Sequence, residues 1–156
     1  MGHVLRRRLQ QARFASVGQE AIINVMIAAN YLRGRLELAC SRQGLTGPQY
    51  NVLRILAAVY PTGHPRFEIQ SRMIERSPDV TRLIDTLIAN RLVERFQSDG
   101  DRRQSMARIT KKGLSLVHQV APHVKKFNED SSNVFTAKEA KELSRLCQKI
   151  YVSDLE

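Results

Sequence analysis

The sequence predicts a mainly α-helical protein that carries one small β-hairpin, and three observations lead to this prediction. Apolar residues recur at helical spacing in long segments, including an almost uninterrupted run over Ala21–Leu32. Capping boxes at Thr46–Gln49 and Thr136–Glu139 mark two helix starts. Only residues 93–109 alternate apolar and polar residues around a turn, as two half-buried strands do.

The charge of the chain is unevenly distributed. The 156 residues are 42% hydrophobic, enough for one sizeable core, and carry a net charge of +10. Residues 1–18 hold four arginines and no acid, and residues 66–113 hold eleven Lys/Arg against seven Asp/Glu. Charge alone does not separate a nucleic-acid partner from a membrane surface or from mere solubility. Because no run reaches the roughly 20 apolar residues of a membrane span, we expect a soluble protein of the cytoplasm.

One helix is predicted from Ser77-Pro78-Asp79, where serine would be the cap and proline the first helical residue, to about Asn90. Its buried stripe is expected to be Val80, Leu83, Ile84, Leu87 and Ile88. Its outward face is expected to carry Asp79, Thr81, Arg82 and Asp85.

A hairpin follows this helix. Strands are predicted over Val93–Phe96 and Ser105–Ile109, with a turn at Asp99-Gly100-Asp101 and Arg102-Arg103 directly behind it. A helix with a polar leading face, followed by a hairpin with two arginines at its tip, is the layout of a winged helix-turn-helix. Such a helix fits the major groove of DNA, and an arginine on a narrow ribbon fits the minor groove.

The segments before the hairpin supply two further features. Gln19–Cys40 is predicted as a long helix that is apolar nearly all round, so it must be covered on all sides. A chain of this size has little material for that, so we predict a subunit interface, with a central core helix of a monomer as the alternative. Phe67–Ile74 is predicted as the first helix of the helix-turn-helix, with Ile69 and Met73 inward, after a turn-rich loop over Tyr60–Pro65.

The segments after the hairpin are also helical. Thr110 can cap a helix over Lys111–Val134, in which Pro122 predicts a kink or a break. A last amphipathic helix begins at Thr136. With the long first helix it would complete a helical dimerisation half, whose contact residues are expected to be Ile22, Ile23, Met26, Ile27, Leu143, Leu146, Ile150 and Tyr151.

The predicted organisation is therefore a basic arm over residues 1–18, a helical dimerisation region over 19–45 and 111–156, and a winged helix-turn-helix over 46–110. Within the last region, the helix-turn-helix spans about 67–90 and the wing about 93–109. The arm is either a solvated segment or a source of additional phosphate attraction.

Catalysis, metal binding and cofactor binding have no support in the sequence. His118 and His123 are five apart, which separates them on a helix, and no phosphate-binding loop or activated nucleophile occurs.

We expect Cys40 and Cys147 to be two buried thiols. Redox sensing is the alternative, and only Cys40 has a neighbouring arginine, Arg42, to lower its pKa.

Three segments in this order and spacing carry a family resemblance: LTGPQYNVLRIL, DVTRLIDTLIANRLVER and DGDRRQSMARITKKG. Over residues 19–152 the chain resembles the multiple-antibiotic-resistance regulator (MarR) family of bacterial transcription factors. The resemblance implies a homodimer, associated with the nucleoid, that binds a pseudo-palindromic operator. It also implies that the protein usually represses and is often released by a small ligand or an oxidant.

By position, the resemblance also implies roles for individual residues. Ser71 and Arg72 would lie near phosphate, and Asp101 would orient Arg103 in the minor groove beside Arg102. Residues at or near the major groove would be Ser77, Pro78, Asp79, Thr81 and Arg82. Family members bind ligands in a crevice between the two halves; Tyr31, Arg35, Tyr50 and Arg54 have the polar character to line it, and ordinary surface packing is the equal alternative for them.

Two departures accompany the resemblance. Many members have glycine where this chain has Arg91, so the turn after the predicted helix lacks a glycine cap. Cys40 lies at the far end of the long helix from the peroxide-sensing cysteine of the family.

A winged helix that binds protein instead of DNA is the rival function, although such modules tend to lose the positive charge that Arg82, Arg102 and Arg103 keep here.

Overall fold

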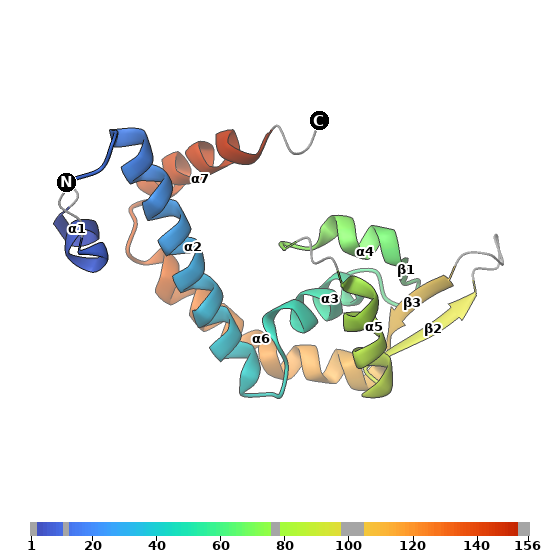
Figure 1. Ribbon diagram of the computed structural model, residues 1–156. Helices are drawn as coiled ribbons and strands as arrows, with labels where there is room; N and C mark the ends of the chain where they lie inside the picture. The colour runs from blue at the N-terminus through green and yellow to red at the C-terminus, as the bar shows by residue number, and fades with distance from the viewer. Residues whose placement is uncertain (1–2, 11–12, 76–78, 98–104, 153–156) are drawn as a thin grey trace.

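The computed structural model describes residues 3–10, 13–75, 79–97 and 105–152. The chain forms two parts that differ in kind (Figure 1): long helices make up one part, and short helices with a small sheet make up the other. The mainly helical fold with a small β wing is therefore confirmed.

The winged part contains α3 (Gly47–Ala57), α4 (Arg66–Arg72) and α5 (Val80–Ala89). These helices close over the hairpin strands β2 (Val93–Gln97) and β3 (Ser105–Ile109). Their apolar faces form the core, in which the most fully buried large side chains include Leu53, Leu56, Ile69, Leu87 and Ile109.

The sheet contains a strand that the sequence pattern did not predict. β1 (His64–Pro65) pairs antiparallel with β3, so the order is β1-β3-β2 and His64 lies opposite Ala107. The predicted turn-rich loop therefore ends as an edge strand. Two residues are too few to show a period-two pattern, and proline is tolerated at a sheet edge.

The N-terminal cap of α5 differs from the prediction. Asp79, not Ser77, is the cap of the described helix, because the Asp79 side chain accepts a hydrogen bond of 3.2 Å from the backbone N–H of Arg82. Serine and aspartate are both strong caps, so sequence could not decide between them.

α5 ends in a left-handed turn at Arg91, whose φ is +59°. The N–H of Leu92 donates to the carbonyl of Leu87, and that of Arg91 donates to Ile88, which is the Schellman arrangement. The absence of glycine therefore does not change the turn. Arginine adopts the strained conformation because buried Leu92 and Leu87 hold the chain on both sides.

Replacing Arg91 with glycine is expected to raise the free energy of unfolding by about 0.5–1 kcal/mol, because glycine adopts a positive φ without steric cost. Asn90 precedes it at a φ of −83°, so Asn90→Gly should not stabilise the protein. Urea unfolding of both variants checks this, and equal effects at the two positions would contradict it.

The start of α6 (Lys111–Ser132) is tied to this turn. The Thr110 hydroxyl donates to the carbonyl of Arg91 at 2.8 Å and accepts from the N–H of Gly113, so the predicted threonine cap is confirmed. A Cβ at Gly113 would lie 2.3 Å from the carbonyl oxygen of Leu92. Glycine is therefore required where the helix crosses the end of the hairpin.

Gly113→Ala is expected to lower the free energy of unfolding by about 1–3 kcal/mol, because backbone must move to admit the methyl group. Gly34 in α2 (Val17–Ser41) has no such neighbour within 4 Å. Gly34→Ala should instead stabilise the protein by about 0.5–1 kcal/mol. Denaturant unfolding of the two variants provides the comparison. If Gly113→Ala leaves the free energy of unfolding unchanged, the contact between α6 and the Leu92 carbonyl is not tight.

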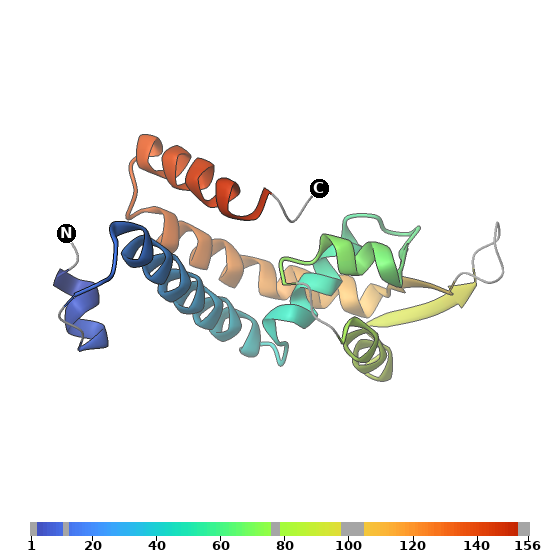
Figure 2. The same ribbon diagram turned by 45° about the horizontal axis from the view of Figure 1, so that its top comes forward.

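The helical part consists of α2, α6 and α7 (Ala137–Tyr151), and α1 (His3–Leu9) precedes it. α6 packs along α2 in both views (Figures 1 and 2). Of the kink or break predicted at Pro122, the break is wrong, because α6 continues unbroken from Lys111 to Ser132. Proline removes only one helical hydrogen bond, and packing of Val117 and Val120 in the core holds the helix on the near side of it.

Candidate nucleic-acid interface

The outward face of α5 is polar. Val80, Ile84 and Leu87 are buried against the core, so Thr81 and Arg82 project on the opposite side. The Arg82 side chain is 83% exposed, and its Nη1 lies 3.9 Å from Oδ2 of Asp79. Ion pairs with this exposure are worth little, so the guanidinium can exchange its partner for a ligand at small cost.

α4 places two further predicted residues on the surface. The Ser71 hydroxyl donates to the Glu68 carbonyl at 3.0 Å. Arg72 donates through Nε and Nη2 to one carboxylate oxygen of Glu68, both at 3.1 Å. Arg72 is exposed but already oriented, so its positive charge stands at a defined place beside α5.

The remaining predicted residues of this interface are Ser77, Pro78, Asp101, Arg102 and Arg103. All five lie outside the described residues.

The structure adds two arginines that the sequence reasoning missed. A hollow of about 230 Å³ between α4, α5 and the wing strands is lined by Arg66, Thr81 and Arg95. Nη2 of Arg95 donates to Oδ1 of Asp85 at 2.8 Å, which joins β2 to α5. A signal was present: Arg95 is two positions after buried Val93, so it lies on the same side of β2 as Val93, and that side faces the helices.

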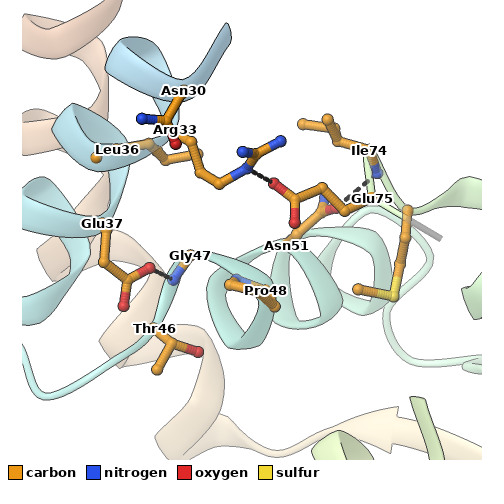
Figure 3. A pocket seen from close by; sticks show the side chains of 12 residues that line it. Asn30, Arg33, Leu36, Glu37, Thr46, Gly47, Pro48, Asn51, Ile74 and Glu75 are labelled. Carbon is orange, nitrogen blue, oxygen red and sulfur yellow. Dashed lines mark hydrogen bonds and ion pairs between the residues drawn. The ribbon is translucent and has the colours of Figure 1, made fainter. Parts of the chain in front are cut away.

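A larger crevice of about 580 Å³ separates α2 from α3 and from the segment after α4. Figure 3 shows its polar residues: Arg33 is ion-paired with Glu75, and Glu37 accepts from the N–H of Gly47 at 2.5 Å. Asn51 accepts from the N–H of Ile74 at 2.9 Å.

The four residues expected to line the crevice do not do so. Tyr31, Arg35, Tyr50 and Arg54 are absent from its walls. Tyr50 is buried in the core instead, and Arg35 faces a groove between α2 and α6. The expectation was wrong because it was based on polar character, whereas the direction of each side chain depends on how α2 crosses α3.

Cys40 is fully buried, as expected, and burial raises its pKa to about 11, with the carboxylate of Glu37 adding to the shift. Little thiolate exists at neutral pH, which argues against Cys40 as an oxidant sensor. Cys147 on α7 is only half-buried, so the prediction of two buried thiols is wrong for this residue.

No helix among the described residues is long and apolar enough to cross a membrane. They also contain no cluster of three or more His, Cys, Asp or Glu side chains that could hold a metal ion.

The chain matches no protein-family model, and no curated protein sequence matches it. Among solved structures, it is 33% identical to a MarR transcription factor from Planctomyces limnophilus, covering 87% of this chain and 98% of that one, with a TM-score of 0.66. The chain belongs to the MarR family of transcription regulators.

Two other MarR-family structures share the fold at lower identity. AbsC from Streptomyces coelicolor is 20% identical, with coverage of 92% of this chain and 98% of that one and a TM-score of 0.79. A mutant MarR from E. coli, solved in complex with operator DNA, is 20% identical, with coverage of 87% and 99% and a TM-score of 0.75. All three of these structures are of MarR-family transcription regulators.

Proposed function

We propose that this MarR-family protein is a sequence-specific DNA-binding repressor that acts as a homodimer on a pseudo-palindromic operator and is released by a small ligand. The observation that carries the proposal is the polar face of α5, where Thr81 and Arg82 project from a helix whose opposite face is buried. A helix of this form can enter the major groove, where guanine offers two acceptors to a guanidinium.

The surroundings of α5 support the same role. Arg72 on α4 and the Arg66–Arg95 hollow place positive charge beside the helix, where phosphates flank the major groove. The E. coli MarR mutant with the same fold was solved with operator DNA, and MepR of S. aureus was solved in complex with DNA. In this proposal Asp79, Ser77 and Pro78 lie near the groove, and Asp101 orients Arg103 in the minor groove beside Arg102.

Uncovered apolar surface on the helical part supports the homodimer. All residues of α7 are described and none of them is buried; its apolar stripe keeps 41–51% of its surface exposed at Leu143, Leu146, Ile150 and Tyr151. On α2, Met26 and Ile22 are exposed, and Ile23 and Ile27 are half-buried. A second copy would cover both surfaces and set the spacing of two reading helices.

Arg82→Ala tests the base-reading role. Loss of one bidentate base contact costs about 1–3 kcal/mol of discrimination, so the variant should weaken operator binding much more than binding to a scrambled duplex. The operator is first obtained by genome-wide footprinting of the purified protein. Titration of both duplexes at one salt concentration gives the result, and Lys125→Ala on α6 is the control for the loss of one charge.

Equal losses on the two duplexes would mean that Arg82 contacts phosphate only. By contrast, Arg103→Ala in the wing should weaken all sequences, most where A·T tracts flank the site, because a narrow minor groove concentrates negative potential. Asp101→Ala should partly reproduce that effect.

A further inference from the structure

The crevice between α2 and α3 contains a buried donor without a partner. Asn51 is only 7% exposed and is the one buried polar residue among those described. Its Oδ1 must face the N–H of Ile74, because only an oxygen can accept that hydrogen bond. Its Nδ2 is then left without a hydrogen-bond partner among the described residues. Buried polar atoms are rarely left unpaired, so a ligand acceptor is the natural partner for this N–H.

The charges of the crevice favour one sign of ligand. Three charged side chains line its described walls: Arg33, Glu37 and Glu75. Arg33 is already engaged by Glu75, whereas Glu37 accepts only from the N–H of Gly47 within the part of the chain that the structure describes. The lining is therefore net negative. An anion would meet two carboxylates, whereas a cation would gain a charge-assisted hydrogen bond.

Apart from Asn30 and Thr46, the remaining side chains of the described walls are apolar. Leu36, Pro48, Met73 and Ile74 line the crevice beside the charged groups. At about 580 Å³, the space is large enough for a compact organic molecule with one aromatic ring.

Two of the three polar contacts of the crevice end on the segment Ile74-Glu75, which precedes α5 in the chain. Asn51 holds the N–H of Ile74, and Arg33 of α2 holds the carboxylate of Glu75, the next residue. Asp79, the cap of α5, lies four positions farther along. A molecule that competes for these contacts acts on the connection between the long helix and the reading helix.

We propose that this crevice binds a small amphiphile that carries a protonated amine and a hydrogen-bond acceptor, and that the bound molecule changes how Asn51 and Arg33 hold Ile74 and Glu75, the segment ahead of α5. The amine binds Glu37 and competes with Arg33 for Glu75, and the acceptor takes the N–H of Asn51. The effect on DNA rests on the proposed function, whereas the binding itself does not.

Three probes of one skeleton test the ligand class: 4-methoxybenzylamine, 4-methoxybenzoate and 4-methoxybenzyl alcohol. Each is titrated to millimolar concentration into the full-length ¹⁵N-labelled protein, and the signals of the Asn51 side-chain amide and the Ile74 backbone amide are followed. The amine is expected to shift both signals and to bind about tenfold more tightly than the alcohol, as one charge-assisted hydrogen bond predicts. Benzoate binding as tight as that of the amine, or no shift at Asn51 and Ile74 with any probe, overturns the proposal.

Glu37→Gln is the decisive variant, because glutamine can still accept from the N–H of Gly47 but has no charge. This variant should weaken binding of the amine about tenfold and leave binding of the alcohol unchanged. Glu129→Gln removes the same charge from an exposed position on α6 and should change the binding of neither probe. If Glu37→Gln and Glu129→Gln behave alike, the electrostatic assignment is wrong.

Operator titration with and without the amine then tests the coupling. The amine should weaken operator binding by the wild type, and Glu75→Gln, which removes the ion pair with Arg33 in advance, should reduce that effect. Amine binding that leaves operator affinity unchanged overturns the coupling. Amine binding by a protein without DNA affinity instead overturns the proposed function and leaves the ligand site intact.

Discussion

Raising the salt concentration from 50 to 200 mM is expected to weaken operator binding by roughly 10³-fold or more, if the two reading heads together meet six or more phosphates. Each neutralised phosphate releases condensed counterions, so log K falls with log salt by about 0.9 per phosphate. The net charge of +10 and the exposed arginines on α4 and α5 supply the cations for these contacts.

Arg66→Ala refines this measurement, because the structure places Arg66 in the hollow beside α5, where phosphate is its expected partner. The variant should bind all duplexes more weakly, and the steepness of the salt dependence should fall by about 1 for each phosphate that the protein no longer neutralises. Binding that hardly changes between the two salt concentrations would instead favour a winged helix that recognises protein.

Replacing Met26 with aspartate is expected to convert a dimer into monomers, because the interface would then bury an unpaired charge at a cost of several kcal/mol. Met26 is 65% exposed in the protomer, so the change leaves the protomer's own packing intact. Sedimentation at micromolar concentration should show only dimer for the wild type and monomer for Met26→Asp.

Ile23→Asp and Ile27→Asp should dissociate the dimer too, but both side chains are half-buried in the protomer, so part of their effect would be loss of stability. Ala58→Asp adds the same charge to an exposed position after α3 and should leave the dimer unchanged. A well-folded wild-type monomer at micromolar concentration would contradict the homodimer.

The sequence by itself determined the elements whose signals are local. The capping boxes at Thr46 and Thr136, the Thr110 cap and the strand Ser105–Ile109 appear where their patterns predicted them. The polar face of α5 also follows from sequence, since helical periodicity assigns each residue to a side. Side-chain caps and periodicity act within a few residues, so a one-dimensional pattern contains them.

The tertiary structure decided everything that depends on residues distant in the chain. β1 exists because β3 passes beside it, and Arg91 adopts a positive φ because the Schellman bonds and Thr110 hold the turn around it. Gly113 is required because it crosses the end of the hairpin.

The two recesses likewise required the folded chain. Arg95 of β2 donates a hydrogen bond to Asp85 of α5, and Arg33 donates one to Glu75, which lies 42 positions away in the chain, at the border of the crevice. The lining of a crevice depends on the angle at which helices cross, and periodicity within one helix does not contain that angle. For this reason the sequence predicted the buried and exposed faces of α5 but placed the wrong side chains around the crevice.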